Sequence, residues 1–159
     1  MCRDHFIHEA LINLIPHEYG SELNILRGIP NDKLAEIVVA IGCNKVAIDG
    51  NGMDYSDGSE CKFANLVTDV DKDGYRRVHT KVSNLKNKTG DLYIVLSDAI
   101  SEVGKVDLRF FKFPYRLWKK MIKGDDFKMS FTSDRWSWYK DHEYTWEELC
   151  DEQRGLERF

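Results

Sequence analysis

Residues 52–62, Gly-Met-Asp-Tyr-Ser-Asp-Gly-Ser-Glu-Cys-Lys, decide how the middle of this 159-residue chain folds. An Asp-Gly turn signal separates two segments of strand-forming residues, so we expect a β-hairpin with arms over 53–56 and 59–67. Because side chains alternate along a strand, Glu60 and Lys62 are expected on the same face. Carboxylates and a lysine on one face of a hairpin can hold a divalent metal and activate a water beside it. This pattern points to metal-dependent cleavage of phosphodiester bonds, with nucleic acid as the substrate.

The length of the turn decides which carboxylate faces Glu60. A two-residue turn would leave Asp54 on the opposite face, whereas a three-residue turn with a left-handed Gly58 would pair Asp54 with Glu60. Asp49 ends a predicted strand over 45–49 and is the other candidate. Both carboxylates therefore remain open as the partner of Glu60.

The donor set suits Mg²⁺, which prefers oxygen ligands and needs only one or two carboxylates plus a substrate phosphate. Asp54 (or Asp49) and Glu60 are the expected metal ligands, and the main-chain carbonyl of Cys61 is a further candidate. Lys62 is expected to position the attacking water or to stabilise the transition state.

The remaining elements follow from apolar periodicity and turn residues. Helices are predicted over 4–15, 21–27, 32–41 and 115–122, and a last helix begins after Thr145. Further strands are predicted over 75–84, 92–96, 106–113, 129–131 and 136–139. Asn31 and Gly42 are the expected cap and terminator of the third helix. The order is helices, a strand meander, then strand, strand and helix, which predicts an α/β fold with a mixed central β-sheet flanked by helices, in a single domain over 1–159.

The net charge of −4 is distributed unevenly along the chain. Residues 62–123 hold 14 Lys and Arg against 7 Asp and Glu, a net +7, whereas the segments on either side are acidic. A basic segment next to an acidic metal site suits a phosphate backbone. The candidate nucleic-acid contacts are Arg76, Arg77, His79, Lys81, Lys86 and Lys88.

The composition favours an intracellular setting. No apolar run approaches the length of a membrane span, so we expect no membrane association. The N-terminal residues show no secretory pattern, and the four cysteines are scattered rather than at metal-binding spacing. We therefore expect a cytoplasmic, reducing location.

The acidic residues and the lysine of the hairpin also resemble a known signature. Asp54 followed by Glu60-Cys61-Lys62 resembles the PD-(D/E)xK motif of the restriction endonuclease-like nucleases, with Met53 at the place of the proline. The resemblance covers roughly residues 4–122 and implies a restriction endonuclease-like core. Family members often draw another acidic residue from the first helix, and Glu9 is the matching position here.

This resemblance implies a Mg²⁺-dependent endonuclease of the restriction, phage or homing type, for which Mn²⁺ can substitute. It implies sequence-specific cleavage of double-stranded DNA to leave 5′-phosphates, and a homodimer is the simplest arrangement for cutting both strands. The competing interpretations are a non-catalytic nucleic-acid-binding protein and a protein-interaction domain that uses the aromatic residues near the C-terminus.

Overall fold

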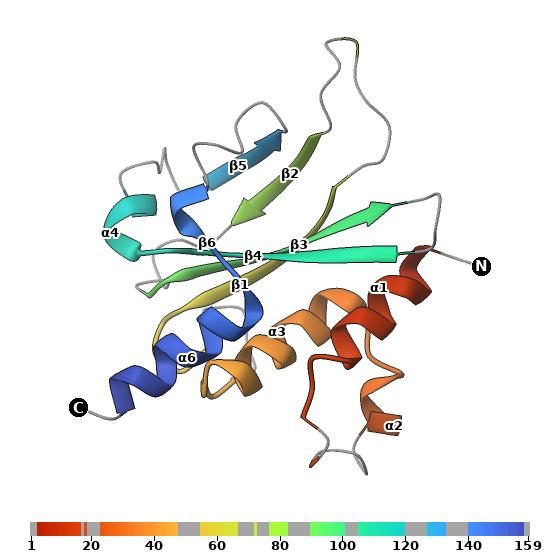
Figure 1. The fold of residues 1–159 in the computed structure, drawn as a ribbon. Coiled ribbons are helices and arrows are strands. Elements are labelled where there is room, and N and C mark those ends of the chain that lie inside the picture. Colours follow the sequence, from red (N-terminus) through yellow and green to blue (C-terminus); the bar gives the residue numbers. More distant parts are fainter. Residues whose placement is uncertain are drawn as a thin grey trace.

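A four-stranded mixed sheet, with helices packed against it, forms the centre of the molecule (Figure 1). The computed structural model describes residues 3–16, 18, 23–47, 55–66, 72, 77–82, 90–100, 105–119, 127–132 and 140–157. The strand order is β1-β3-β4-β6, with bounds Glu60–Leu66, Leu92–Ile100, Lys105–Phe113 and Glu143–Tyr144. β1 runs parallel to β3, and the other two pairs are antiparallel. The prediction of an α/β fold with a mixed central sheet is confirmed.

Three helices cover one face of this sheet, as Figure 1 shows. They are α1 (Arg3–Ile12), α3 (Asn31–Gly42) and α6 (Trp146–Glu157). The short helix α2 (Leu23–Leu26) comes between α1 and α3 in the sequence. Ile7 and Leu11 of α1 and Val39 of α3 are fully buried. They share one apolar cluster with Tyr93 and other residues of the sheet, because each helix turns one apolar stripe toward it.

The opposite face of the sheet carries a second, smaller sheet (Figure 1). β2 (Arg77–Val82) and β5 (Phe127–Thr132) pair antiparallel there. β2 lies beside β1, although the two strands belong to different sheets. The short helix α4 (Tyr115–Trp118) follows β4, and a 3-10 turn (Lys140–His142) precedes β6.

β3 is enclosed on both faces, as its nearly continuous apolar sequence predicts. Every side chain from Leu92 to Leu96 is at most 2% exposed. By alternation, Tyr93 and Val95 lie toward the helices, and Leu92, Ile94 and Leu96 lie toward the other face. The strand that pairs with β1 is therefore a rigid central support.

The expected strand meander is wrong in one respect. β2 follows β1 in the sequence, but it joins the separate sheet with β5, and β1 pairs instead with β3. Parallel strands need a long crossover, and the chain between β1 and β3 includes β2. The alternation of apolar residues shows that a segment forms a strand but does not select its partner.

The ends of α3 agree only in part with the prediction. Pro30 is the N-cap and Asn31 is the first helical residue, so the predicted cap is displaced by one residue; the Asn31 side chain contacts His8. Gly42 is the last residue of α3, so the helix ends where predicted, and the left-handed residue beyond it is Asn44. A Cβ at Gly42 would lie 2.3 Å from the ring of Trp146, so this glycine permits close packing of α6.

Candidate active site

The turn before β1 has the longer of the two predicted geometries. The Tyr55 amide donates to the Ser59 carbonyl (3.2 Å), and the Gly58 amide donates to the Tyr55 carbonyl (3.0 Å). Gly58 has a φ of 88°, the left-handed conformation that glycine adopts without strain. The three-residue turn is therefore confirmed, with Tyr55 opposite Ser59.

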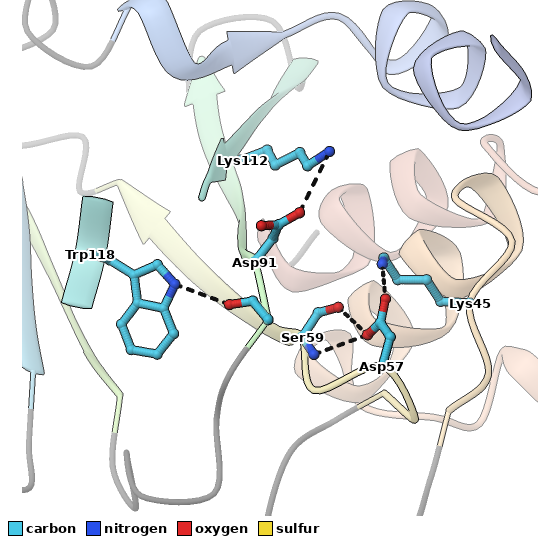
Figure 2. A network of polar contacts seen from close by, with 7 residues as sticks. Lys45, Asp57, Ser59, Asp91, Lys112 and Trp118 are labelled. Atoms are coloured by element: carbon cyan, nitrogen blue, oxygen red, sulfur yellow. Dashed lines mark hydrogen bonds and ion pairs between the residues drawn. The ribbon is translucent and has the colours of Figure 1, made fainter. Parts of the chain in front are cut away.

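Polar contacts of Asp57 hold this turn in place (Figure 2). Its carboxylate accepts hydrogen bonds from the Ser59 amide (3.0 Å) and the Ser59 hydroxyl, and it forms an ion pair with Lys45. Burial acts to raise the pKa of Asp57, but the hydrogen bonds from Lys45 and Ser59 outweigh it and leave the pKa below its ordinary value. Asp57 is thus a structural acid in its charged form.

The start of β3 is fixed against the same turn. The Gly90 amide donates to the Gly58 carbonyl (2.9 Å), and the Glu60 amide donates to the Asp91 carbonyl (3.0 Å). Figure 2 shows two side chains that secure this segment: the Trp118 indole donates to the Gly90 carbonyl (3.1 Å), and Lys112 lies 3.6 Å from the Asp91 carboxylate. Residues from five separate segments therefore meet at the N-terminal end of β1.

The aromatic ring of Tyr93 packs beneath the two lysines of this network. The ammonium groups of Lys45 and Lys112 lie 5.2 and 5.9 Å from the ring centroid. Tyr55 contacts the same ring edge-on, and its hydroxyl donates to the Glu36 carbonyl of α3 (2.7 Å). The attraction between each ammonium group and the Tyr93 ring stabilises these lysine positions. Because Tyr93 belongs to the apolar core, the contacts connect the charged network to that core.

Glu60 and Lys62 extend from the end of β1 that this network fixes. The Lys62 Nζ lies 3.3 Å from the Glu60 Oε1, so the prediction that the two side chains share a face is confirmed. The Glu60 side chain is 3% exposed, whereas the Lys62 side chain is 32% exposed. A buried carboxylate beside a partly exposed ammonium group leaves one charged group accessible to a substrate.

The other predicted acidic residues have different positions. Glu9, on α1, forms a 2.6 Å ion pair with Arg27, so any role for Glu9 at a metal would require this pair to open. Asp49 and Asp54 lie outside the described residues. The Cys61 side chain is buried in the core cluster, and its backbone lies in the parallel ladder opposite Tyr93.

The predicted nucleic-acid contacts divide into two groups. Arg77, His79 and Lys81 lie on β2, the strand beside β1, where they alternate in the sequence. Arg76, Lys86 and Lys88 lie outside the described residues.

Two features are absent from the described residues. These residues contain no group of three or more His, Cys, Asp and Glu side chains that could hold a metal ion. They also contain no helix that is both long enough and apolar enough to span a bilayer. Among the predicted carboxylate ligands that lie in the described part of the chain, Glu60 is the one that forms an ion pair with Lys62.

Sequence reasoning did not identify the residues that fix Glu60 in position. The Asp-Gly-Ser sequence at 57–59 carries a recognisable signal, because an Asp side chain commonly accepts a hydrogen bond from the amide two residues later. Lys45, Lys112 and Trp118 carry no local signal, since their contacts depend on the packing of distant segments.

No family model, curated protein or solved structure matches the chain.

Proposed function

We propose that this chain is a Mg²⁺-dependent DNA endonuclease with a restriction endonuclease-like core. The observation that carries the proposal is the contact between the buried Glu60 carboxylate and the partly exposed Lys62 ammonium group, 3.3 Å apart on one strand. Charged groups that are held in place on a strand can stabilise the negative charge that develops in a phosphoryl-transfer transition state. The network around Asp57 and Gly90 supports the proposal, because it fixes the strand end that bears both groups.

Glu60 and Asp54 are the proposed metal ligands, with Asp49 as the alternative to Asp54. The three-residue turn favours Asp54, because a hairpin with Tyr55 opposite Ser59 pairs the preceding residue with Glu60 if the register continues. The Cys61 carbonyl is a further proposed oxygen ligand. The described residues alone provide one carboxylate, which fits Mg²⁺ only together with a second acid and a substrate phosphate.

When bound, Mg²⁺ supplies Lewis-acid chemistry that lowers the pKa of water and neutralises charge on the phosphate. Lys62 orients the attacking water and stabilises the negative charge that builds on the phosphate oxygens. Water attacks phosphorus, the 3′-oxygen leaves, and the product carries a 5′-phosphate. Burial of Glu60 keeps competing solvent away from the carboxylate.

Double-stranded DNA is the proposed substrate, because residues 62–123 carry the chain's excess of positive charge. Arg77, His79 and Lys81 recur at every second position of β2, which lies beside β1, and are proposed phosphate contacts. Arg76, Lys86 and Lys88 are proposed to extend this basic surface. A homodimer would bring two such sites to the two DNA strands.

The competing candidate is a nucleic-acid-binding protein without catalysis. The basic segment favours DNA binding in both cases, so binding alone does not separate the two proposals. Cleavage that depends on a metal does separate them.

The test is incubation of the purified protein with mixed-sequence duplex DNA and Mg²⁺, with and without EDTA, followed by analysis of the DNA ends. We expect discrete fragments with 5′-phosphates that form with Mg²⁺ or Mn²⁺ and disappear with EDTA. Salt-sensitive binding without cleavage of any DNA, including methylated, branched and single-stranded forms, would establish the competing candidate.

A further inference from the structure

A cleft of about 640 Å³ lies on the helix side of β1. It is lined by α1, by the turn over residues 27–32 that leads into α3, and by Phe63 and Asn65 of β1. Because side chains alternate along the strand, Phe63 and Asn65 lie on the opposite face from Glu60 and Lys62. The cleft is therefore a separate feature from the proposed catalytic pair, and its volume lies within the usual range for small-molecule sites.

One wall of the cleft carries an oriented histidine. The Nδ1 of His8 lies 2.9 Å from the Oδ1 of Asn31, so Nδ1 is the donor and Nε2 is left as an acceptor. This Nε2 is shielded from solvent and has no hydrogen-bond partner among the described residues. A buried polar atom without a partner is uncommon in proteins, and a ligand with an N–H donor would satisfy it.

Two further polar side chains present donors at the cleft. The Oδ1 of Asn65 accepts a hydrogen bond from the buried Ser97 hydroxyl (2.6 Å), which fixes the amide and leaves its N–H groups for another partner. Arg27 donates through one nitrogen to Glu9 (2.6 Å), and a guanidinium group has five N–H donors in all. The cleft thus holds both acceptors and donors.

The apolar part of the cleft comes from Phe63, Ile29 and Pro30. Phe63 is half-buried, because it packs against the core cluster and also lines the cleft. An aromatic ring next to several donors and acceptors is a typical environment for a flat heteroaromatic ligand with a polar edge.

The charges around the cleft argue against recognition of phosphate alone. Arg27 is paired with Glu9, and Asp32 also lines the cleft, so its surroundings are not strongly positive. A ligand recognised mainly through an uncharged polar edge fits these residues better than an inorganic anion does.

We propose that this cleft binds the base of a nucleotide, with the base against Phe63 and its polar edge facing His8, Asn65 and Asp32. The nucleotide comes either from solution or from an unstacked position in a DNA strand, and the two sources present the same base. Base binding here does not require metal or cleavage, so it stands or falls independently of the proposed nuclease activity.

The test is a titration of ¹⁵N-labelled protein, without metal, with each of four nucleoside monophosphates and then with a single-stranded oligonucleotide. Ribose 5-phosphate and inorganic phosphate are the ligands without a base. We expect base-bearing ligands alone to shift the His8 Nε2 resonance and the amides of Phe63 and Asn65. Shifts with mononucleotides would identify a free nucleotide as the ligand, and shifts with the oligonucleotide alone would identify an unstacked base of DNA.

Three variants make the test specific. Phe63→Leu retains an apolar side chain but removes the ring, and should weaken binding roughly ten-fold. Asn65→Asp retains the acceptor for Ser97 but removes the N–H donors, and should also weaken binding. Glu147→Gln, at an exposed position of α6 away from the cleft, should bind like the wild type. Equal shifts with inorganic phosphate, no shifts with any base-bearing ligand, or unchanged binding in Phe63→Leu and Asn65→Asp would overturn the proposal.

Discussion

Replacement of Gly90 by alanine tests whether the network behind Glu60 is as tightly packed as the structure shows. An added Cβ would lie 2.5 Å from the Ser59 nitrogen and 2.7 Å from the Gly58 carbonyl carbon. Ordinary contacts begin near 3.4 Å, so the two backbone segments must separate by about 0.9 Å. Both atoms belong to backbone, so a change of side-chain rotamer cannot relieve the clash.

The expected cost follows from two effects. Overpacking of a close contact costs about 1–3 kcal/mol, and loss of the Gly90 to Gly58 hydrogen bond costs about 1 kcal/mol more. The reduced flexibility of the unfolded Gly90→Ala chain offsets about 0.4–1 kcal/mol. We expect the free energy of unfolding to fall by about 2–3 kcal/mol and Tm to fall by roughly 4–12 °C.

Urea unfolding, followed by circular dichroism, measures this change. Gly28→Ala is the matched control, because its Cβ would lie 3.6 Å from the nearest atom, the Ile25 carbonyl oxygen, at ordinary contact distance. The control should unfold within about 0.5 kcal/mol of the wild type. If Gly90→Ala were as stable as Gly28→Ala, the close approach of the two segments would be refuted.

Four other substitutions probe three separate parts of the structure. Folding lowers the pKa of Asp57 from its ordinary value of 3.8, so the Asp57 carboxylate stabilises the fold above pH 3.8, and this contribution is lost as the pH falls further. Urea unfolding at several pH values measures the stability difference between the wild type and Asp57→Asn. This difference should be constant near neutral pH and should shrink below about pH 4. Trp118→Phe removes the indole donor to Gly90 from a fully buried position, and differential scanning calorimetry should show a loss of about 1–3 kcal/mol; an unchanged Tm would contradict the hydrogen bond. Thr145→Ala removes the hydroxyl that accepts a hydrogen bond from the Glu148 amide (3.1 Å) at the start of α6, and should lower the free energy of unfolding in chemical denaturation by about 1 kcal/mol. In Glu148→Gln the side chain can still accept the reciprocal hydrogen bond from the Thr145 amide, so this variant should lose less stability. An unchanged stability of Thr145→Ala would show that the cap does not act through the Thr145 hydroxyl.

Much of the fold could be predicted from local patterns. The apolar run over 92–96 identifies a strand enclosed on both faces, and Thr145 marks the start of the last helix. Both predictions succeed because each depends on residues close together in the sequence. The parallel pairing of β1 with β3 and the departure of β2 to a second sheet could not be predicted, because they depend on contacts between distant segments.

The candidate site shows the same division between local and distant contacts. The shared face of Glu60 and Lys62 follows from the two-residue period of a strand. The left-handed Gly58 was one of two turn geometries consistent with the sequence, and backbone hydrogen bonds decide between them. Lys45 and Trp118 could not be assigned to the site in advance, since they reach the turn only through tertiary packing.

The most direct test of the nuclease proposal is the single-turnover rate of DNA cleavage in Mg²⁺ by Lys62→Ala, compared with the wild type. Lys33→Ala is the matched control, because Lys33 lies on the surface of α3 and forms an ion pair with Glu36 of the same helix. DNA binding, measured with EDTA present, and thermal melting show whether each variant still binds DNA and folds. We predict that Lys62→Ala binds DNA but cleaves it at least about 100-fold more slowly, and that Lys33→Ala cleaves at the wild-type rate. Cleavage by Lys62→Ala at the wild-type rate, or no cleavage by the wild type on any DNA, would contradict the proposal.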